Sequence, residues 1–274
     1  TTEIYTLSLH DALPILDGTL FDAKKNISKE NIDAIKKAKE KGIKVVIATG
    51  RPISGVKPIL EQLNLTTTED YVIIYNGAKV YNVGTEKIIF SSTINGSDVK
   101  ALYNESLRLN VNFHAFRKNE ELITPKHNPY TDVESTINHV EDHLFDFNTI
   151  NDNDEFLKAM MVDSDENITK IIPLVNKSYV EKYSMVRSSK IFLEFLNKST
   201  HKGHALTALA NYLNISLDEV MAIGDAGNDL PMIEVAGIGV AMENAFKEVK
   251  EKANKITLDN EHSGVAYAIL NYAM

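Results

Sequence analysis

Two carboxylates directly after an apolar run are the residues of this sequence best suited to chemistry. In "VMAIGDAGNDLPM", Asp225 and Asp229 lie four positions apart in a glycine-containing segment. A loop of this kind behind a buried strand is a layout that binds hard cations through oxygen ligands. The alternative is a helix start capped by Asn228 or Asp229, which needs no ligand.

Three further short motifs carry groups that suit an anion. "ATGR" ends an apolar run with Thr49, whose hydroxyl and neighbouring backbone N–H groups can hold a phosphate oxygen. Lys202 begins a predicted helix, where a lysine opposes the helix dipole, and this conflict indicates an anionic ligand. "DGT" places Asp17 in an acidic turn. Taken singly, an ordinary turn and a solvent-exposed lysine also explain these motifs.

Apolar runs that alternate with helical patterns must position these groups. Ser28 can cap a helix that precedes the run "IKVVIATG", and "YVIIYNG" and "VMAIGD" predict two further buried strands. Strands that alternate with helices favour an α/β fold with a parallel sheet covered on both faces. Ligands of such sheets bind beyond the carboxyl ends of the strands, where we expect Asp17, Thr49, Asn76 and Asp225.

The middle of the chain, residues 84–195, has a different pattern from its flanks. It contains short or alternating strand candidates, such as "VNFHAF" and "FLEFL", and two helical patterns. We therefore expect two domains: a core formed by residues 1–83 and 196–274, and an inserted α+β domain between them. The length of 274 residues agrees, since single domains usually have about 100–200.

The composition excludes several classes of protein. A net charge of −9 without a basic cluster argues against a nucleic-acid partner. No apolar run reaches the ~18 residues of a membrane span, and the first residues lack the pattern of a secretory signal. Without cysteine the chain has neither disulfides nor thiolate sites. We expect a cytoplasmic protein, monomeric or homodimeric.

The order and spacing of the motifs resemble those of the haloacid dehalogenase-like phosphatases. Asp-Gly-Thr follows the first strand, Thr-Gly-Arg the second, Lys-Gly opens a later helix, and Gly-Asp-x-x-Asn-Asp follows a late strand. The insertion resembles the cap of the Cof-type branch, class IIB, and "FLEFLNKSTHKGHAL" is similar to its YidA-like sugar phosphatases. The resemblance implies a Rossmann-like core, a cap that sets substrate choice, and Mg²⁺-dependent hydrolysis of small phosphorylated metabolites, sugar phosphates foremost.

The resemblance also implies roles for the motif residues. Asp17 would protonate the leaving oxygen and later deprotonate the attacking water, and its backbone carbonyl would bind the metal. Thr49 would hold a phosphoryl oxygen, and Lys202 would neutralise charge on the nucleophile and the phosphate. The expected Mg²⁺ site consists of Asp17 and Asp225, with Asp229 in a supporting role. The expected substrate-binding residues are Thr49, Gly50, Arg51, Asn76, Lys202 and Asn228.

The nucleophile of the family is missing from its expected position. An aspartate two residues before Asp17 attacks the phosphoryl group in the family, but this sequence has Ile15 there. Asp11 does not replace it, because it would lie inside the strand. The opening "TTEIYTLSLHDALPI" resembles translated sequencing-adapter sequence, so an overwritten start is the preferred explanation; the rival is a non-catalytic protein that binds phosphorylated metabolites. Either way, we expect the chain as written to be nearly inactive.

Overall fold

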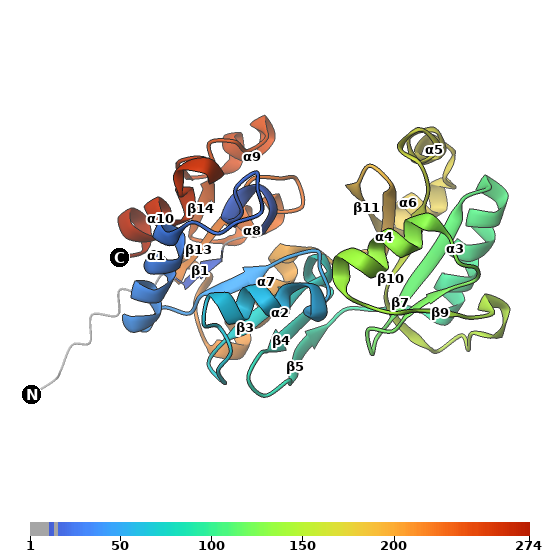
Figure 1. Cartoon of the computed structure of the whole chain (residues 1–274), viewed down its shortest axis with the longest axis horizontal. Coiled ribbons are helices and arrows are strands. Elements are labelled where there is room, and N and C mark those ends of the chain that lie inside the picture. The colour runs from blue at the N-terminus through green and yellow to red at the C-terminus, as the bar shows by residue number, and fades with distance from the viewer. Residues whose placement is uncertain (1–10, 14–15) are drawn as a thin grey trace, which may run out of the picture.

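The computed structural model describes residues 11–13 and 16–274, with the backbone alone at residues 11–13 and 17. Ile15 therefore lies outside the described residues. Figure 1 shows two α/β halves side by side, one built from both flanks of the chain and the other from its middle. The predicted α/β class, with a core and an inserted second unit, is confirmed.

Two four-stranded sheets form the half built from the flanks, which we call the core. One is parallel throughout, in the order β1 (Asp11–Leu13), β13 (Val220–Gly224), β14 (Ile238–Ala241) and β15 (Lys255–Ile256). The other has the order β2 (Val46–Ala48), β3 (Tyr71–Ile74), β4 (Lys79–Asn82) and β5 (Ile88–Ser91). Because β1 also contacts β2, the two sheets adjoin at their parallel strands.

The strands β4 and β5 depart from the predicted parallel arrangement. β2 pairs parallel with β3, but β4 pairs antiparallel with both β3 and β5. The short helical turn η2 (Tyr75–Gly77) joins β3 to β4, with φ angles of 52° at Tyr75 and 54° at Asn76. A turn of this length reverses the chain, whereas a parallel connection needs a dozen or more residues.

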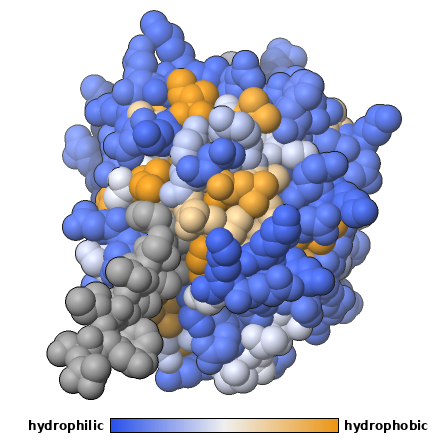
Figure 2. Space-filling model, turned by 90° about the vertical axis from the view of Figure 1, so that its left-hand side faces the viewer, coloured by the Kyte–Doolittle hydropathy of each residue, from blue (hydrophilic) through white to orange (hydrophobic). Residues whose placement is uncertain are grey.

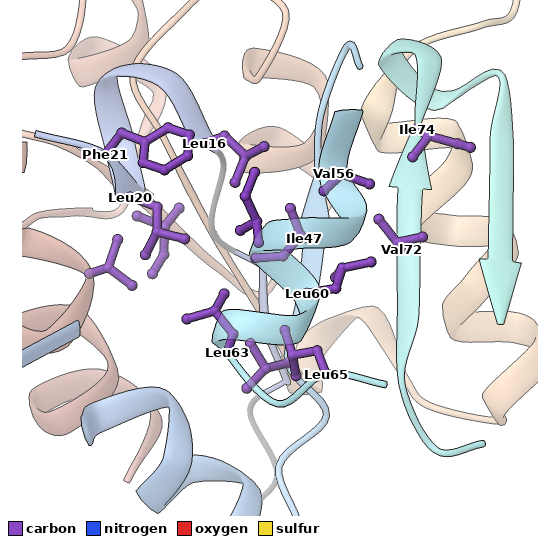
Figure 3. Close-up of a cluster of buried hydrophobic side chains, with 14 of the residues drawn as sticks. Leu16, Leu20, Phe21, Ile47, Val56, Leu60, Leu63, Leu65, Val72 and Ile74 are labelled. Atoms are coloured by element: carbon purple, nitrogen blue, oxygen red, sulfur yellow. The ribbon is translucent and has the colours of Figure 1, made fainter. Parts of the chain in front are cut away.

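Helices pack on both faces of the core sheets. These are α1 (Lys29–Glu40), α2 (Ile53–Gln62), α7 (Lys202–Leu213), α8 (Leu230–Val235), α9 (Lys247–Lys252), α10 (Gly264–Ala268) and the terminal turn η7 (Ile269–Ala273). The Ser28 hydroxyl caps α1 as predicted, since it accepts a hydrogen bond from the Asn31 N–H. Successive residues of the core strands pack on opposite faces of the sheet. Ile47 and Val72 pack with Leu60 of α2 (Figure 3), whereas the intervening side chains pack against α7.

The second half contains one seven-stranded sheet and four helices. The sheet has the order β11 (Tyr183–Ser189), β12 (Phe192–Asn197), β10 (Glu155–Val162), β7 (Asn112–Arg117), β8 (Leu122–Thr124) and β9 (Asp142–Leu144), with β6 (Ile94–Asn95) paired to β10. The helices α3 (Gly96–Leu109), α5 (Asp165–Ile171) and α6 (Lys177–Lys182) cover one face, and α4 (Pro129–Asn138) packs on the other, beside α2 of the core. We call this half the cap.

Two neighbouring segments, residues 92–93 and 197–200, connect the core to the cap. The Thr200 hydroxyl donates to the Ser92 hydroxyl at 2.8 Å, and the Asn197 side chain donates to the Thr93 carbonyl at 2.9 Å. β5 pairs with β4 and therefore belongs to the core sheet. Residues 84–91 thus lie with the core, although the sequence analysis placed the start of the inserted unit at residue 84. The independence of the two units as domains remains a prediction.

The end of the core that faces away from the cap has a mainly hydrophilic surface with separate apolar areas (Figure 2). Several large apolar side chains are exposed near the C-terminus, among them Ile256, Leu258 and Leu270. In the part of the chain that the structure describes, no helix is long and apolar enough to cross a membrane.

Candidate active site

A cavity of about 840 Å³ lies between the ends of the core strands and the cap. Its core side contains all six predicted substrate-binding residues and one predicted metal residue. These are Thr49, Gly50, Arg51, Asn76, Lys202, Asn228 and Asp229. Asp225 lies beside this group but does not line the cavity, and the side chain of Asp17 lies outside the described residues.

Thr49 follows the last residue of β2, at the start of the loop between β2 and α2. Its hydroxyl oxygen accepts a hydrogen bond from the Arg51 N–H at 3.1 Å, and its carbonyl accepts one from the Asn76 N–H at 3.0 Å. The side chains of Asn228 and Asn76 in turn contact each other at 3.1 Å. Three loops from distant parts of the sequence are thereby joined around one end of the cavity. The Thr49 hydroxyl keeps its own proton for a ligand.

Lys202 and Asp229 form a buried ion pair beside Thr49. The Lys202 ammonium lies 2.8 Å from Asp229 Oδ1, and each side chain is only 1% exposed. The other oxygen, Asp229 Oδ2, accepts hydrogen bonds from the N–H groups of Asp225 at 3.1 Å and Ala226 at 2.9 Å. Both oxygens of Asp229 are therefore engaged. This arrangement fits a counter-ion of Lys202 that also holds the loop in shape, and it fits a direct metal ligand less well.

Asp225 is packed against the loop that follows β1. The Thr19 hydroxyl donates to Asp225 Oδ1 at 2.6 Å, and the Asn244 amide donates to the Gly18 carbonyl at 2.7 Å. Gly18 has φ +75°, and a Cβ there would collide with the Asp225 carboxylate. This close approach requires glycine. The backbone of the turn η1 (Leu16–Leu20), which contains Asp17, is thus fixed beside Asp225.

The protein provides few ligands for a cation at this site, so substrate phosphate and water would supply the others. Among the described residues, no three His, Asp or Glu side chains are grouped as a metal site. What the site offers is the Asp225 carboxylate next to the backbone of the η1 turn. Mg²⁺ is commonly bound through one or two carboxylates, substrate phosphate and water, so this donor set is small but suitable.

The cap contributes charged residues that the sequence analysis did not identify. Glu134 of α4, Lys158 of β10 and Glu194 of β12 line the same cavity, and all three are buried. Asn244, which binds the Gly18 carbonyl, was also missed. A signal for two of them was present, since Lys158 and Glu194 are single charged residues within the apolar runs "FLKAMMV" and "FLEFL".

Comparisons with known proteins agree with this arrangement. The family model of haloacid dehalogenase-like hydrolases matches residues 16–269. The putative phosphatase YxeH of Bacillus subtilis is 42% identical over 256 residues, which are 93% of this chain and 94% of that protein. A haloacid dehalogenase-like hydrolase from Bacteroides thetaiotaomicron has the same fold, with a TM-score of 0.84, 30% identity and coverage of 96% and 98% of the two chains. The class IIB sugar phosphatase BT4131 has a TM-score of 0.78 at 25% identity, with 96% and 98% covered. The chain belongs to the Cof-type phosphatases of the haloacid dehalogenase-like hydrolase family.

Proposed function

We propose that this chain binds small phosphorylated metabolites, sugar phosphates foremost, and that its site is built for Mg²⁺-dependent hydrolysis of their phosphomonoester bond. The observation that carries the proposal is the convergence of Thr49, Lys202 and Asn228 on one cavity. A hydroxyl, an ammonium and an amide aimed at one space provide the donors and the positive charge that a phosphate group needs. The likeness to a sugar phosphatase supports the choice of substrate class.

Each core residue then has a distinct task. Thr49 donates its hydroxyl proton to a phosphate oxygen, because its own oxygen already accepts from the Arg51 N–H. Lys202 is held in place by Asp229 and offsets the phosphate charge from a buried position. Asp17 donates a proton to the leaving oxygen and later removes one from the attacking water.

Asp225 and the backbone carbonyl of Asp17 are the groups that would hold Mg²⁺. When bound, this cation supplies Lewis-acid polarisation of a phosphate oxygen. Asp229 acts indirectly, since its carboxylate accepts from the Asp225 N–H and fixes the loop from which Asp225 projects. This is the supporting role that the resemblance implies for Asp229.

Ile15 removes one step from this scheme. The family reaction passes through an aspartyl-phosphate, which divides one difficult displacement into two easier ones. An isoleucine has no nucleophile, so we expect turnover to fall by on the order of 10⁴ to 10⁶ relative to a chain with aspartate at this position. The contacts that bind phosphate involve other residues and stay in place.

A second function follows from the same substitution. A chain that keeps Thr49, Lys202 and Asp225 but has Ile15 is suited to bind a phosphorylated metabolite without turning it over. Such a protein would act as a binder of phosphometabolites. Measured binding with negligible hydrolysis, even after the nucleophile is restored, is the result that favours this alternative.

The experiment compares three proteins in the hydrolysis of p-nitrophenyl phosphate and a panel of sugar phosphates with Mg²⁺. They are the chain as written, its Ile15→Asp variant, and a chain whose residues 1–16 are replaced by a family-like strand with aspartate at position 15. We expect almost no activity, partial activity and high activity, in that order. The single substitution restores less because Pro14 cannot donate to a central strand, and a carboxylate misplaced by about 1 Å can lose ~10²-fold in rate.

The control is Asp17→Asn in the repaired chain, which should lose most of the recovered activity. High, EDTA-sensitive activity in the chain as written would refute the argument about the nucleophile. A repaired chain that folds well, binds sugar phosphates and remains inactive would instead support the binding function.

A further inference from the structure

Three charged side chains form a buried cluster in the cap wall of the cavity, which we call the cap charge cluster. The Lys158 ammonium lies 3.2 Å from Glu134 Oε1 and 3.1 Å from Glu194 Oε1. The side chains of Lys158, Glu134 and Glu194 are 2%, 6% and 4% exposed. Charges are rarely buried to this degree unless they are paired.

The register of the cap sheet places these residues on the face toward the core. Met160 of β10 lies opposite Glu194 of β12, and Lys158 lies two residues before Met160, so all three share one face. Residues on the opposite face, such as Phe195, pack against the helices α3 and α5. Glu134 approaches from α4, which lies on the cavity side of the sheet. The cluster is thus part of the cavity wall and not of the cap core.

One acceptor of the cluster has no partner. Among the described residues, Glu194 Oε2 makes no hydrogen bond although it is fully buried, whereas Oε1 is bound to Lys158. An unsatisfied buried carboxylate oxygen costs free energy that a donor could recover. Because Glu194 lines the cavity, a ligand there can supply that donor once the carboxylate turns toward it.

The cluster also carries one negative charge more than its single ammonium offsets. Burial alone would lower the pKa of Lys158, but the two neighbouring carboxylates outweigh it and raise this pKa. The pKa of Glu134 is raised by burial and further by the charge of Glu194, although Lys158 opposes both effects. A ligand group with hydrogen-bond donors is therefore favoured here, and a second anion is repelled.

We propose that the cap charge cluster is the subsite for the leaving group, and that it selects phosphomonoesters whose alcohol part is uncharged and rich in hydroxyl groups. Anionic alcohol parts, with a carboxylate or a second phosphate, bind more weakly. The inference rests on the proposed function, since it needs the phosphate at Thr49 and Lys202 on the other side of the cavity. The volume of about 840 Å³ lies within the range of ~300–1,000 Å³ that is usual for small-molecule sites.

Two ligands that differ at one end provide the test. Glucitol 6-phosphate ends in a CH₂OH group where 6-phosphogluconate has a carboxylate, and both carry the same phosphate. We measure their dissociation constants by calorimetry with Mg²⁺, together with that of inorganic phosphate, on the chain as written, whose slow turnover leaves the ligands intact. We expect glucitol 6-phosphate to bind at least about tenfold more tightly than 6-phosphogluconate.

Glu194→Gln is the decisive variant, because it keeps an oxygen for Lys158 and removes the excess charge. In this variant the preference should shrink to about threefold or less, while the affinity for inorganic phosphate stays unchanged. Glu134→Gln makes the same change of charge from α4 and serves if the first variant does not fold. The control is Glu155→Gln at the start of β10, where an exposed carboxylate bonds to Lys118 outside the cavity, and it should keep the full preference.

The outcomes separate the two proposals. If inorganic phosphate binds but the two esters bind equally in the chain as written, the inference about the cap charge cluster is wrong and the proposed function stands. An unchanged preference in both Glu194→Gln and Glu134→Gln also overturns the inference. If neither the esters nor inorganic phosphate bind, the proposed function itself is wrong, and the inference is wrong with it.

Discussion

Replacing Asp229 by asparagine should destabilise the protein strongly, because it leaves the charge of Lys202 buried without a counter-ion. The two charged groups lie 2.8 Å apart, and both side chains are 1% exposed. At an effective dielectric constant of about 20, the attraction between them is roughly 6 kcal/mol. Breaking one side of a buried pair usually costs about 3–5 kcal/mol, and we expect a loss in that range.

The asparagine isolates the effect of charge from that of shape. Its oxygen still accepts from the N–H groups of Asp225 and Ala226, which now bind Asp229 Oδ2. The double variant Lys202→Met/Asp229→Asn removes both charges, and it should be more stable than Asp229→Asn alone by at least about 2 kcal/mol. The free energy of unfolding is measured in urea by circular dichroism, since the chain has no tryptophan to report by fluorescence.

The matched control is Asp165→Asn, which breaks an exposed ion pair with Arg187 at 2.6 Å. The Asp165 side chain is 54% exposed, so its loss should change stability by no more than about 1 kcal/mol. A loss below about 1 kcal/mol for Asp229→Asn, combined with weaker Mg²⁺ binding, would refute the assignment of Asp229 as the counter-ion and make it a metal ligand.

Three further predictions concern the cap, the metal site and the first loop. Burial, with a smaller effect from Lys158, lowers the pKa of His114 from 6.5 to about 3. The unfolded chain therefore binds a proton below pH 6.5 that the folded chain does not, and stability falls as the pH decreases from 6.5 toward 3. Unfolding measurements should give a loss of about 2 kcal/mol between pH 7.5 and pH 5 that is absent in His114→Asn. Asp225→Asn should weaken Mg²⁺ binding at least about tenfold in calorimetry, and equal affinities would remove Asp225 from the metal site. Gly18→Ala should lower the free energy of unfolding by about 1–3 kcal/mol, since φ +75° strains the new residue and its Cβ collides with Asp225; unchanged urea unfolding would contradict this.

The sequence predicted which loops meet but not how their side chains pair. Thr49, Asn76 and Asp225 each follow an apolar run, and the carboxyl ends of neighbouring strands meet at one edge of a sheet. The pairing of Lys202 with Asp229 depends on how the start of α7 packs against a loop 27 residues later, which no local pattern records. The conflict between Lys202 and the helix dipole predicted an anionic ligand; the structure places the protein's own Asp229 carboxylate beside the ammonium, and the ligand stays a prediction.

The cap shows more clearly why side-chain pairing could not be predicted from the sequence. Lys158 and Glu194 are 36 residues apart, and only the register of β10 against β12 brings them onto one face. Glu134 lies on a helix, and the sequence around it, "TDVEST", contains no apolar run that would indicate burial. A single charge within an apolar strand indicates burial with a partner, but the partner's identity requires the tertiary structure. The sequence analysis did not identify β4 as a strand; its antiparallel direction follows from the turn η2, which is too short for a parallel crossover.

Restoring the nucleophile should weaken substrate binding when the metal is absent, although it restores catalysis when the metal is present. In the proposed function a carboxylate at position 15 faces the phosphorus, and two anions that approach closely repel one another. Mg²⁺ normally offsets that repulsion, so the difference appears in EDTA. We expect the chain with Ile15 to bind a sugar phosphate about tenfold more tightly than Ile15→Asp in EDTA, and the gap to narrow with Mg²⁺. Ile15→Asn is the control for size and polarity without charge, and it should bind as the chain as written does. Equal affinity of all three proteins in EDTA would show that position 15 does not face the bound phosphate, and the assignment of the missing nucleophile would then be wrong.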